Sequence, residues 1–135
     1  MGNTEFTEVN LLQRGNAIDS QLAYDVELEI DGVKGEWLFD SGATGFTIGN
    51  IMFNRLTANG VKYKDLNKTV KSFGIGGEVY GDLVILEEVK IGGYSVRNVV
   101  ATVLDTPNSL LGTGFLLKFS NVIWNMKDKK LVIYK

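Results

Sequence analysis

One short segment of the chain combines residue types that could do chemistry. Asp40-Ser41-Gly42-Ala43-Thr44 directly follows the apolar run Trp37-Leu38-Phe39. The 135-residue sequence contains no histidine and no cysteine, which excludes Ser-His-Asp triads, Cys-His pairs and zinc-thiolate sites within one chain. Proton transfer therefore has to use carboxylates, lysines or tyrosines. The best candidate is Asp40, a carboxylate that directly follows an apolar strand and begins a tight glycine turn.

The composition indicates a globular protein with one domain over residues 1–135, in which residues 1–20 form an N-terminal extension or strand. The chain is 44% hydrophobic and 22% charged, with a formal net charge of −2. Acids and lysines are interleaved, which argues against a nucleic-acid binder. No apolar run is long enough for a membrane span. Residues 1–5 lack the features of a signal peptide, so two locations stay open: inside the cell, or exported to the periplasm or the outside after loss of a leader.

Strand patterns dominate the chain and predict an all-β fold. Polar and apolar residues alternate in several segments that end at Gly, Asn or Asp. Two short helices are expected, one over about 51–58 with Asn50 as N-cap, and one over about 113–118. Trp37 and Trp124 are interpreted as fillers of the core or of an interface. The predicted strands are Tyr24–Ile30, Val33–Phe39, Val79–Ile91, Tyr94–Leu104, Asn121–Asn125 and Leu131–Tyr134.

Three segments have to be considered together. The first is the Asp40–Thr44 turn, the second is the glycine-dense stretch Ser72–Gly81, and the third is Ser109-Leu110-Leu111-Gly112. In this order they resemble the retropepsin-like aspartic proteases, which have an Asp-Thr/Ser-Gly-Ala loop, a β-hairpin flap and a hydrophobic-hydrophobic-Gly motif. Ile91-Gly92-Gly93 and the closing hairpin are more similar to the bacterial and cellular members than to the viral ones. The resemblance runs from about residue 24 to the C-terminus.

The resemblance implies a single-lobe, closed β-barrel with a flap hairpin, and it gives each segment a role. Asp40 would be catalytic, and the flap would cover a bound peptide as a mobile lid. Leu110, Leu111 and Gly112 would pack beneath the Asp40 loop. No metal and no cofactor is expected, and the partner would be a peptide or protein substrate. The residues expected to support the catalytic loop are Ser41, Gly42, Ala43 and Thr44, and those expected to bind substrate from the flap are Phe73, Gly74, Ile75, Gly76 and Gly77.

Peptide hydrolysis by carboxylates needs two of them, one to deprotonate water and one to act on the carbonyl. Two acids a few ångströms apart hold a single proton between them. Asp40 is the one suitable aspartate, because Asp105-Thr106-Pro107 and Asp19-Ser20 both lack the following glycine. The pair is therefore predicted to come from a homodimer, in which Asp40 of each subunit meets on a twofold axis.

Two positions depart from the family pattern. Gly114 stands where many members have an Asp or Asn whose side chain supports the core, so that this support comes from elsewhere or is missing. Phe46 stands where a small hydroxyl residue is often found, and Thr47 could supply the hydroxyl one step later. Three hypotheses follow: a homodimeric aspartic endopeptidase, a peptide-binding or scaffold module that has lost turnover, and a monomeric piece whose partner lobe lies elsewhere.

Overall fold

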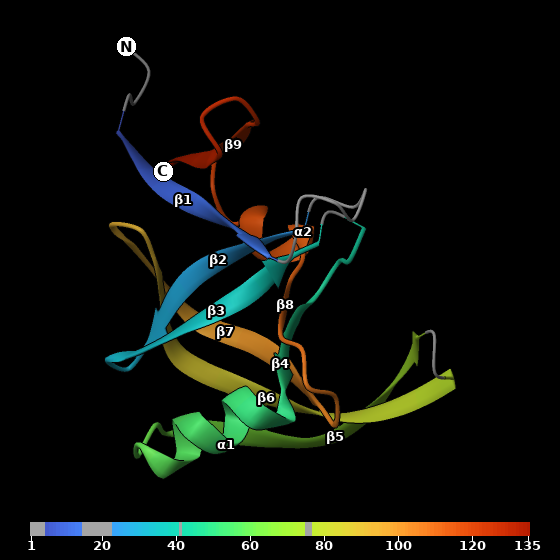
Figure 1. Cartoon of the computed structure of the whole chain (residues 1–135). Coiled ribbons are helices and arrows are strands. Elements are labelled where there is room, and N and C mark those ends of the chain that lie inside the picture. The colour runs from blue at the N-terminus through green and yellow to red at the C-terminus, as the bar shows by residue number, and fades with distance from the viewer. Residues whose placement is uncertain (1–4, 15–22, 41, 75–76) are drawn as a thin grey trace.

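The structure is a computed structural model that describes residues 5–14, 23–40, 42–74 and 77–135. Strands make up most of these residues, so the all-β prediction is confirmed (Figure 1). No helix in these ranges is long and apolar enough to cross a membrane. The elements are β1 (Phe6–Arg14), β2 (Ala23–Ile30), β3 (Val33–Phe39), β4 (Phe46–Gly49), α1 (Asn50–Ala58), β5 (Tyr63–Gly74), β6 (Gly77–Ile91), β7 (Tyr94–Leu104), β8 (Leu110–Leu111), α2 (Thr113–Leu116), β9 (Asn121–Asn125) and β10 (Lys130–Tyr134).

The strands form a single, strongly curved sheet. Their order is β5-β6-β7-β4-β8-β3-β2-β1-β10-β9, and an additional pairing between β2 and β6 brings the sheet back onto itself. β2 can pair with both β1 and β6 because its first half, Ala23–Val26, lies beside β1, whereas Leu28–Ile30 lies beside β6. The curvature encloses one apolar core, and the β5–β6 hairpin extends beyond it (Figure 1).

The two-residue strand β8 is inserted between β3 and β4. It runs parallel to β3, with Leu38 opposite Leu110, and antiparallel to β4, with Phe46 opposite Leu111. The chain that leaves β3 at Asp40 therefore returns as β4 on the far side of β8. This arrangement brings residues about 70 positions apart in the sequence into adjacent strands, and it holds the Asp40 turn over the end of β8.

The core follows the alternation in the sequence. Val26, Leu28 and Ile30 of β2 are buried, whereas Glu27 between them is exposed. Trp37 is 0% exposed. Its ring stacks on Phe46 at a centroid distance of 5.7 Å, and its Nε1–H donates to the carbonyl of Thr47 (3.1 Å). Trp37 thereby joins β3 to β4 from inside, directly beneath the segment that carries Asp40.

The expected N-cap of the first helix is wrong. Asn50 is the first residue of α1, and Gly49 occupies the N-cap position without a side-chain hydrogen bond. The Asn50 amide instead donates to Oδ1 of Asp105 (2.7 Å), and its backbone N–H donates to the carbonyl of Thr106 (2.9 Å). Asn50 therefore ties the start of α1 to the loop after β7, and a local capping rule could not anticipate that long-range partner.

Trp37→Ala should lower the free energy of unfolding by about 3–5 kcal/mol, because it removes a fully buried ring and leaves a cavity between β3 and β4. Ile51→Ala is the control, since Ile51 on α1 is 66% exposed and should change stability by less than about 0.5 kcal/mol. Urea unfolding followed by tryptophan fluorescence and circular dichroism at one protein concentration measures both. Equal stability of the two variants would contradict this account of the core.

Candidate active site

Asp40 follows the last residue of β3 and is half-buried as a residue. Its backbone N–H donates to the carbonyl of Leu111 (3.1 Å), which continues the β3–β8 pairing by one residue. Its carbonyl accepts from the N–H of Ala43 (3.1 Å), which closes a tight turn. The N–H of Gly42 donates to Oδ1 of Asp40 (3.0 Å). Hydrogen bonds thus hold the main chain of Asp40 on both sides, and one backbone N–H orients its carboxyl, which can bind or activate a small polar molecule.

The rest of the turn is fastened to the segment that follows β8. The N–H groups of residues 112, 113 and 114 donate to the carbonyls of Gly45 (3.0 Å), Ala43 (2.9 Å) and Thr44 (2.9 Å), respectively. The hydroxyl of Thr113 also donates to the carbonyl of Ala43 (3.2 Å). Helix α2 begins at Thr113, so its first N–H groups, which have no partner within a helix, are satisfied by the carbonyls of the Asp40 turn.

Two glycines permit this approach. A Cβ at Gly112 would collide with the carbonyl oxygens of Gly45 and Ala43, and a Cβ at Gly114 would collide with that of Thr44. Both contacts are to backbone atoms, which cannot rotate away. At Gly114, the turn is supported by a backbone hydrogen bond from the N–H of this residue to the carbonyl of Thr44.

Ser109 is a site-supporting residue whose role the sequence did not reveal. It is buried, its Oγ accepts from the N–H of Gly49 (2.9 Å), and its carbonyl accepts from the N–H of Leu38 (2.8 Å). It therefore joins the strands on both sides of β8. The sequence contains one indication of this role, namely a small hydroxyl residue immediately before two bulky aliphatic residues.

Phe46 does not border the Asp40 carboxyl. It is buried in the core, where its ring lies between those of Trp37 and Phe115, at centroid distances of 5.7 Å and 5.4 Å. Thr47, the neighbouring residue on β4, is half-buried. The departure from the family pattern at Phe46 is thus a change in core packing.

The expected flap is the distal part of the β5–β6 hairpin. Its register runs from Lys71 opposite Tyr80 to Gly74 opposite Gly77, and Gly77 has a φ of +104°. An ion pair joins Lys71 and Glu78 across the two strands at 2.9 Å. Of the residues named individually in the sequence analysis, five lie outside the described residues: Asp19, Ser20, Ser41, Ile75 and Gly76.

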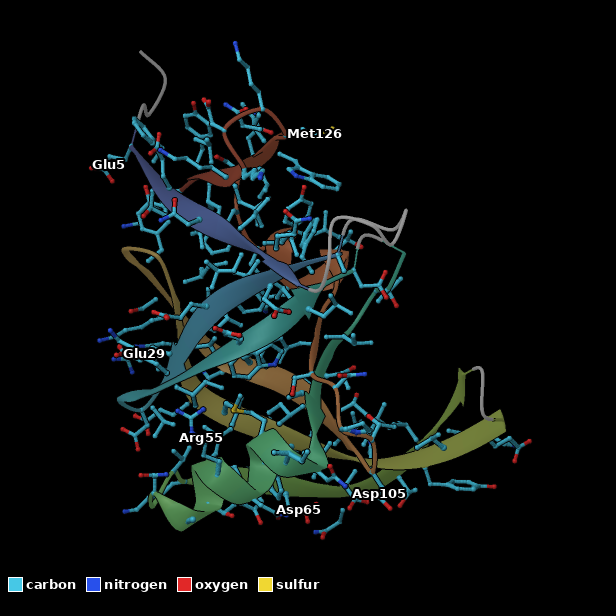
Figure 2. The ribbon with its side chains drawn as sticks, in the orientation of Figure 1. Glu5, Glu29, Arg55, Asp65, Asp105 and Met126 are labelled. Atoms are coloured by element: carbon cyan, nitrogen blue, oxygen red, sulfur yellow. The ribbon has the colours of Figure 1, made fainter. Side chains whose placement is uncertain are left out.

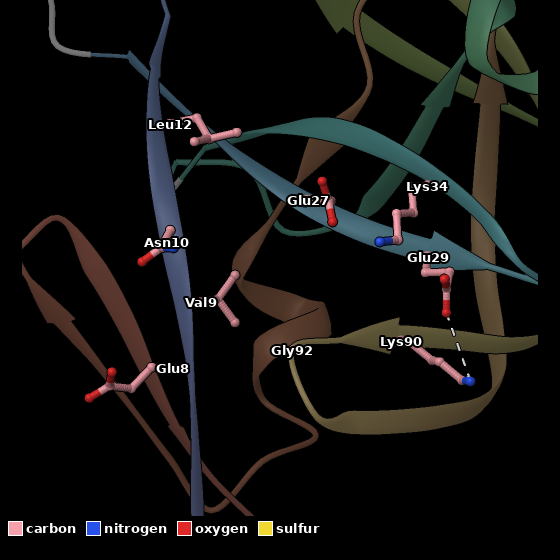
Figure 3. A pocket seen from close by; sticks show the side chains of 9 residues that line it. All are labelled: Glu8, Val9, Asn10, Leu12, Glu27, Glu29, Lys34, Lys90 and Gly92. Carbon is pink, nitrogen blue, oxygen red and sulfur yellow. Dashed lines mark ion pairs between the residues drawn. The ribbon is translucent and has the colours of Figure 1, made fainter.

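Asp105, the other aspartate considered, lies apart from the Asp40 turn. It follows β7, close to the start of α1 (Figure 2), and its Oδ1 accepts from the Asn50 amide. A hollow of about 430 Å³ lies on the outer side of β1, β2 and β3 (Figure 3), but no predicted site residue lines it. Acids and lysines alternate around it, and Glu29 is paired with Lys90 at 3.8 Å. We therefore assign neither feature to the site.

A carboxylate turn after one strand, fastened to a Leu-Leu-Gly strand inserted beside it, defines the lobe of an aspartic protease. A family model described as aspartyl protease matches residues 26–115, and the chain belongs to this family. Its fold is retropepsin-like. A crystal structure of a retropepsin-like aspartic protease from Rickettsia conorii matches it with a TM-score of 0.64 and 21% sequence identity, over 96% of this chain and 92% of that one. No curated protein sequence matches the chain.

Gly114→Ala should destabilise the protein by about 1–3 kcal/mol, because the added methyl group forces apart the start of α2 and the carbonyl of Thr44. Gly45→Ala, in the turn that faces the start of α2, is the control, since a Cβ there meets no atom within 4 Å. Thermal unfolding of both variants at equal concentration is the measurement. A Gly114→Ala protein as stable as Gly45→Ala would show that the close approach is not required.

Proposed function

We propose that this protein is a homodimeric aspartic endopeptidase in which Asp40 of each subunit supplies one member of the catalytic pair. The observation that carries the proposal is the Asp40 carboxyl itself, bound by the N–H of Gly42 on a turn that three further backbone hydrogen bonds hold in place. Membership of the aspartyl protease family supports the reaction class. The dimer follows from chemistry, because one carboxylate cannot act as acid and base at once.

The proposed reaction begins with a water molecule between the two carboxyl groups, which share one proton. The ionised carboxylate takes a proton from the water, and the oxygen of that water bonds to the peptide carbonyl carbon. The other carboxyl gives its proton to the carbonyl oxygen, and a tetrahedral diol forms. The carboxyl that took the proton from water then gives it to the amide nitrogen, the C–N bond breaks, and the other carboxylate takes a proton from a hydroxyl of the diol. The products are a carboxylic acid and an amine, and the carboxyl pair again shares one proton. No metal and no cofactor takes part in these steps.

The residues around Asp40 have positioning roles in this proposal. The Gly42 N–H orients the carboxyl by donating to its Oδ1. Ala43 leaves room for substrate beside the pair, and Thr44 holds the turn through its carbonyl. Ser41 would bond across the dimer axis, as its family counterparts do. Leu110, Leu111 and Gly112 support the turn from below.

The substrate in this proposal is an extended peptide with apolar residues on both sides of the cleaved bond. The distal β5–β6 hairpin, with Phe73, Gly74 and Gly77, would close over it together with Ile75 and Gly76. A peptide in extended form can add to strand edges through backbone hydrogen bonds, so affinity need not depend on one side chain. Closure would exclude water and strengthen the interactions of the carboxyl pair.

Asp40→Asn should lower the rate of peptide cleavage by at least about 100-fold while the fold and the dimer persist, because an amide can neither take nor share the proton. Digestion of a peptide library, read by mass spectrometry, measures the loss. Asp105→Asn is the control and should keep the wild-type rate. Cleavage by Asp40→Asn would refute the assignment, and wild-type protein that binds peptides without cleaving them would favour the binding-module hypothesis.

The cleavage rate should be highest at mildly acidic pH and fall on both sides. At lower pH a second proton occupies the pair and removes the base, and at higher pH the shared proton is lost and removes the acid. Rates from about pH 4 to about pH 7, with circular dichroism at each pH to separate unfolding, test this. A rate that rises steadily toward alkaline pH would exclude a shared-proton pair.

A further inference from the structure

Strand β7 is paired along its whole length on one side and only near its end on the other. β6 lies antiparallel beside it from Tyr94 to Leu104, whereas β4 pairs only with residues 102–104. No other strand among the described residues pairs with residues 94–101. In an antiparallel ladder every second residue directs its N–H and C=O away from the neighbouring strand. The first part of β7 therefore presents unpaired backbone groups along an open edge.

Two hollows follow this open edge. One has a volume of about 440 Å³ and is lined by residues 93–97. The other has a volume of about 260 Å³ and is lined by residues 99–100. Asn98, which has a φ of +55°, separates them on β7. Lys118, which follows α2, lines both hollows, so they lie end to end along the strand. We call the two hollows together the β7 groove.

The wall of the β7 groove opposite the strand comes from the segment after α2 and from the Asp40 turn. Phe119 lines the larger hollow, and its ring stacks on that of Tyr94 at a centroid distance of 6.1 Å and an interplanar angle of 26°. Thr44 and Gly45 line the smaller hollow. A ligand in the groove would therefore lie between β7 and this wall, with one end against the Asp40 turn.

The charged side chains that line the β7 groove are all basic. They are Arg97, Lys118 and Lys135, and none of the described residues in the lining is acidic. The whole chain has 16 acids and 14 bases, and the hollow on β1–β3 has both signs, so this lining differs from the rest of the surface.

Little of this positive charge is neutralised within the protein. Arg97 has a distant partner in Glu88, at 3.8 Å. Among the described residues, no carboxylate lies within ion-pair distance of Lys118. A concave surface with charge of one sign attracts ligands of the opposite sign. The groove is therefore suited to an anionic ligand.

The two faces of β7 indicate where the charges of such a ligand lie. Tyr94 and Val96 are half-buried, whereas Ser95 and Arg97 are exposed, because successive residues of a strand point to opposite faces. A strand paired with this edge would place its side chains in the same two layers. Those on the face of Val96 would meet Phe119 and should be apolar. Those on the face of Arg97 should be acidic.

We propose that the β7 groove binds an extended polypeptide segment in which acidic and apolar residues alternate, and that this segment adds to residues 94–97 as a further strand. In such strand addition the main-chain hydrogen bonds provide affinity and the alternate side chains provide specificity. The partner is a segment of another protein. The site is distinct from the proposed catalytic cleft, and no step of the inference uses Asp40.

Peptide binding tests the predicted charge pattern. The probe is a fluorescein-labelled peptide of about eight residues in which Glu and Val alternate, and a peptide of alternating Lys and Val is its control. Fluorescence anisotropy is measured on Asp40→Asn protein, so that cleavage does not consume the probe. The Glu-Val peptide should bind at least about tenfold more tightly than the Lys-Val peptide, and the difference should shrink at high salt. Equal affinities would overturn the proposal.

Charge reversal at Lys118 tests the location of the site. In the same Asp40→Asn protein, Lys118→Glu should weaken binding of the Glu-Val peptide at least about tenfold and strengthen binding of the Lys-Val peptide. Lys64→Glu on β5 is the matched control, since it makes the same change in net charge far along the sheet and should leave both affinities unchanged. Both lysines are exposed, and circular dichroism checks that both variants fold. Equal effects of the two variants would show attraction by net charge alone and would overturn the groove.

A peptide of alternating Glu and Pro tests strand addition, since it keeps the charges while proline lacks the N–H that pairing requires. It should bind at least about tenfold more weakly than the Glu-Val peptide. Hydrogen exchange followed by nuclear magnetic resonance should show slower exchange of amides in residues 94–97 with the Glu-Val peptide bound, and no change on β5. Tight binding of the Glu-Pro peptide, or unchanged exchange on β7, would overturn strand addition.

These outcomes are independent of the proposed function. Binding of the Glu-Val peptide that Lys118→Glu abolishes supports the groove even where the wild-type protein cleaves no peptide. Failure of that peptide to bind at concentrations up to about 1 mM overturns the groove and leaves Asp40-dependent cleavage untouched.

Discussion

The constraint on which the candidate site depends is the close approach of two pieces of backbone. Residues 112–114 donate three successive N–H groups to the carbonyls of the Asp40 turn. Gly112 and Gly114 make this possible, since a side chain at either position would meet a carbonyl oxygen. The donors lie at the start of α2, and the acceptors are the carbonyls of residues 43–45, just before β4. Satisfying both sets at once fixes the turn, and the Asp40 carboxyl with it.

The part of the fold that depends on local alternation could be predicted from the sequence. β3, β7 and β9 have the bounds that the pattern predicts, because each alternates or is uniformly apolar and ends at a turn residue. The pattern did not reveal β4, which is four residues long, or that β5 begins as early as Tyr63. It also misassigned Asn50, whose amide binds Asp105 rather than the end of its own helix. Long-range partners decide such positions, and periodicity carries no information about them.

Within the site, too, features that depend on local sequence could be predicted and features that depend on long-range contacts could not. The order of the Asp-Ser-Gly-Ala, glycine-rich and Leu-Leu-Gly segments was sufficient to identify the family, because each segment has a residue type that its position requires. The roles of Ser109 and Thr113 were not predictable, since each acts through a hydrogen bond to a residue at least 60 positions away. The change at Phe46 is explained only by the stack of Trp37, Phe46 and Phe115. A sequence comparison treats this position as part of the site, whereas the packing assigns it to the core.

A short lobe that holds one carboxylate meets two requirements that one interface could satisfy. The proposed hydrolysis requires a second carboxylate. At the β9 edge, the apolar side chains of Ile123 and Trp124 are exposed to solvent. An edge strand without charges favours association with another strand, and β9 carries no charge. The charged and bulged β5 strand has the opposite features, and it leads into the hairpin that is proposed to close over substrate. The two edges of the sheet therefore differ in the residues that govern pairing with another strand.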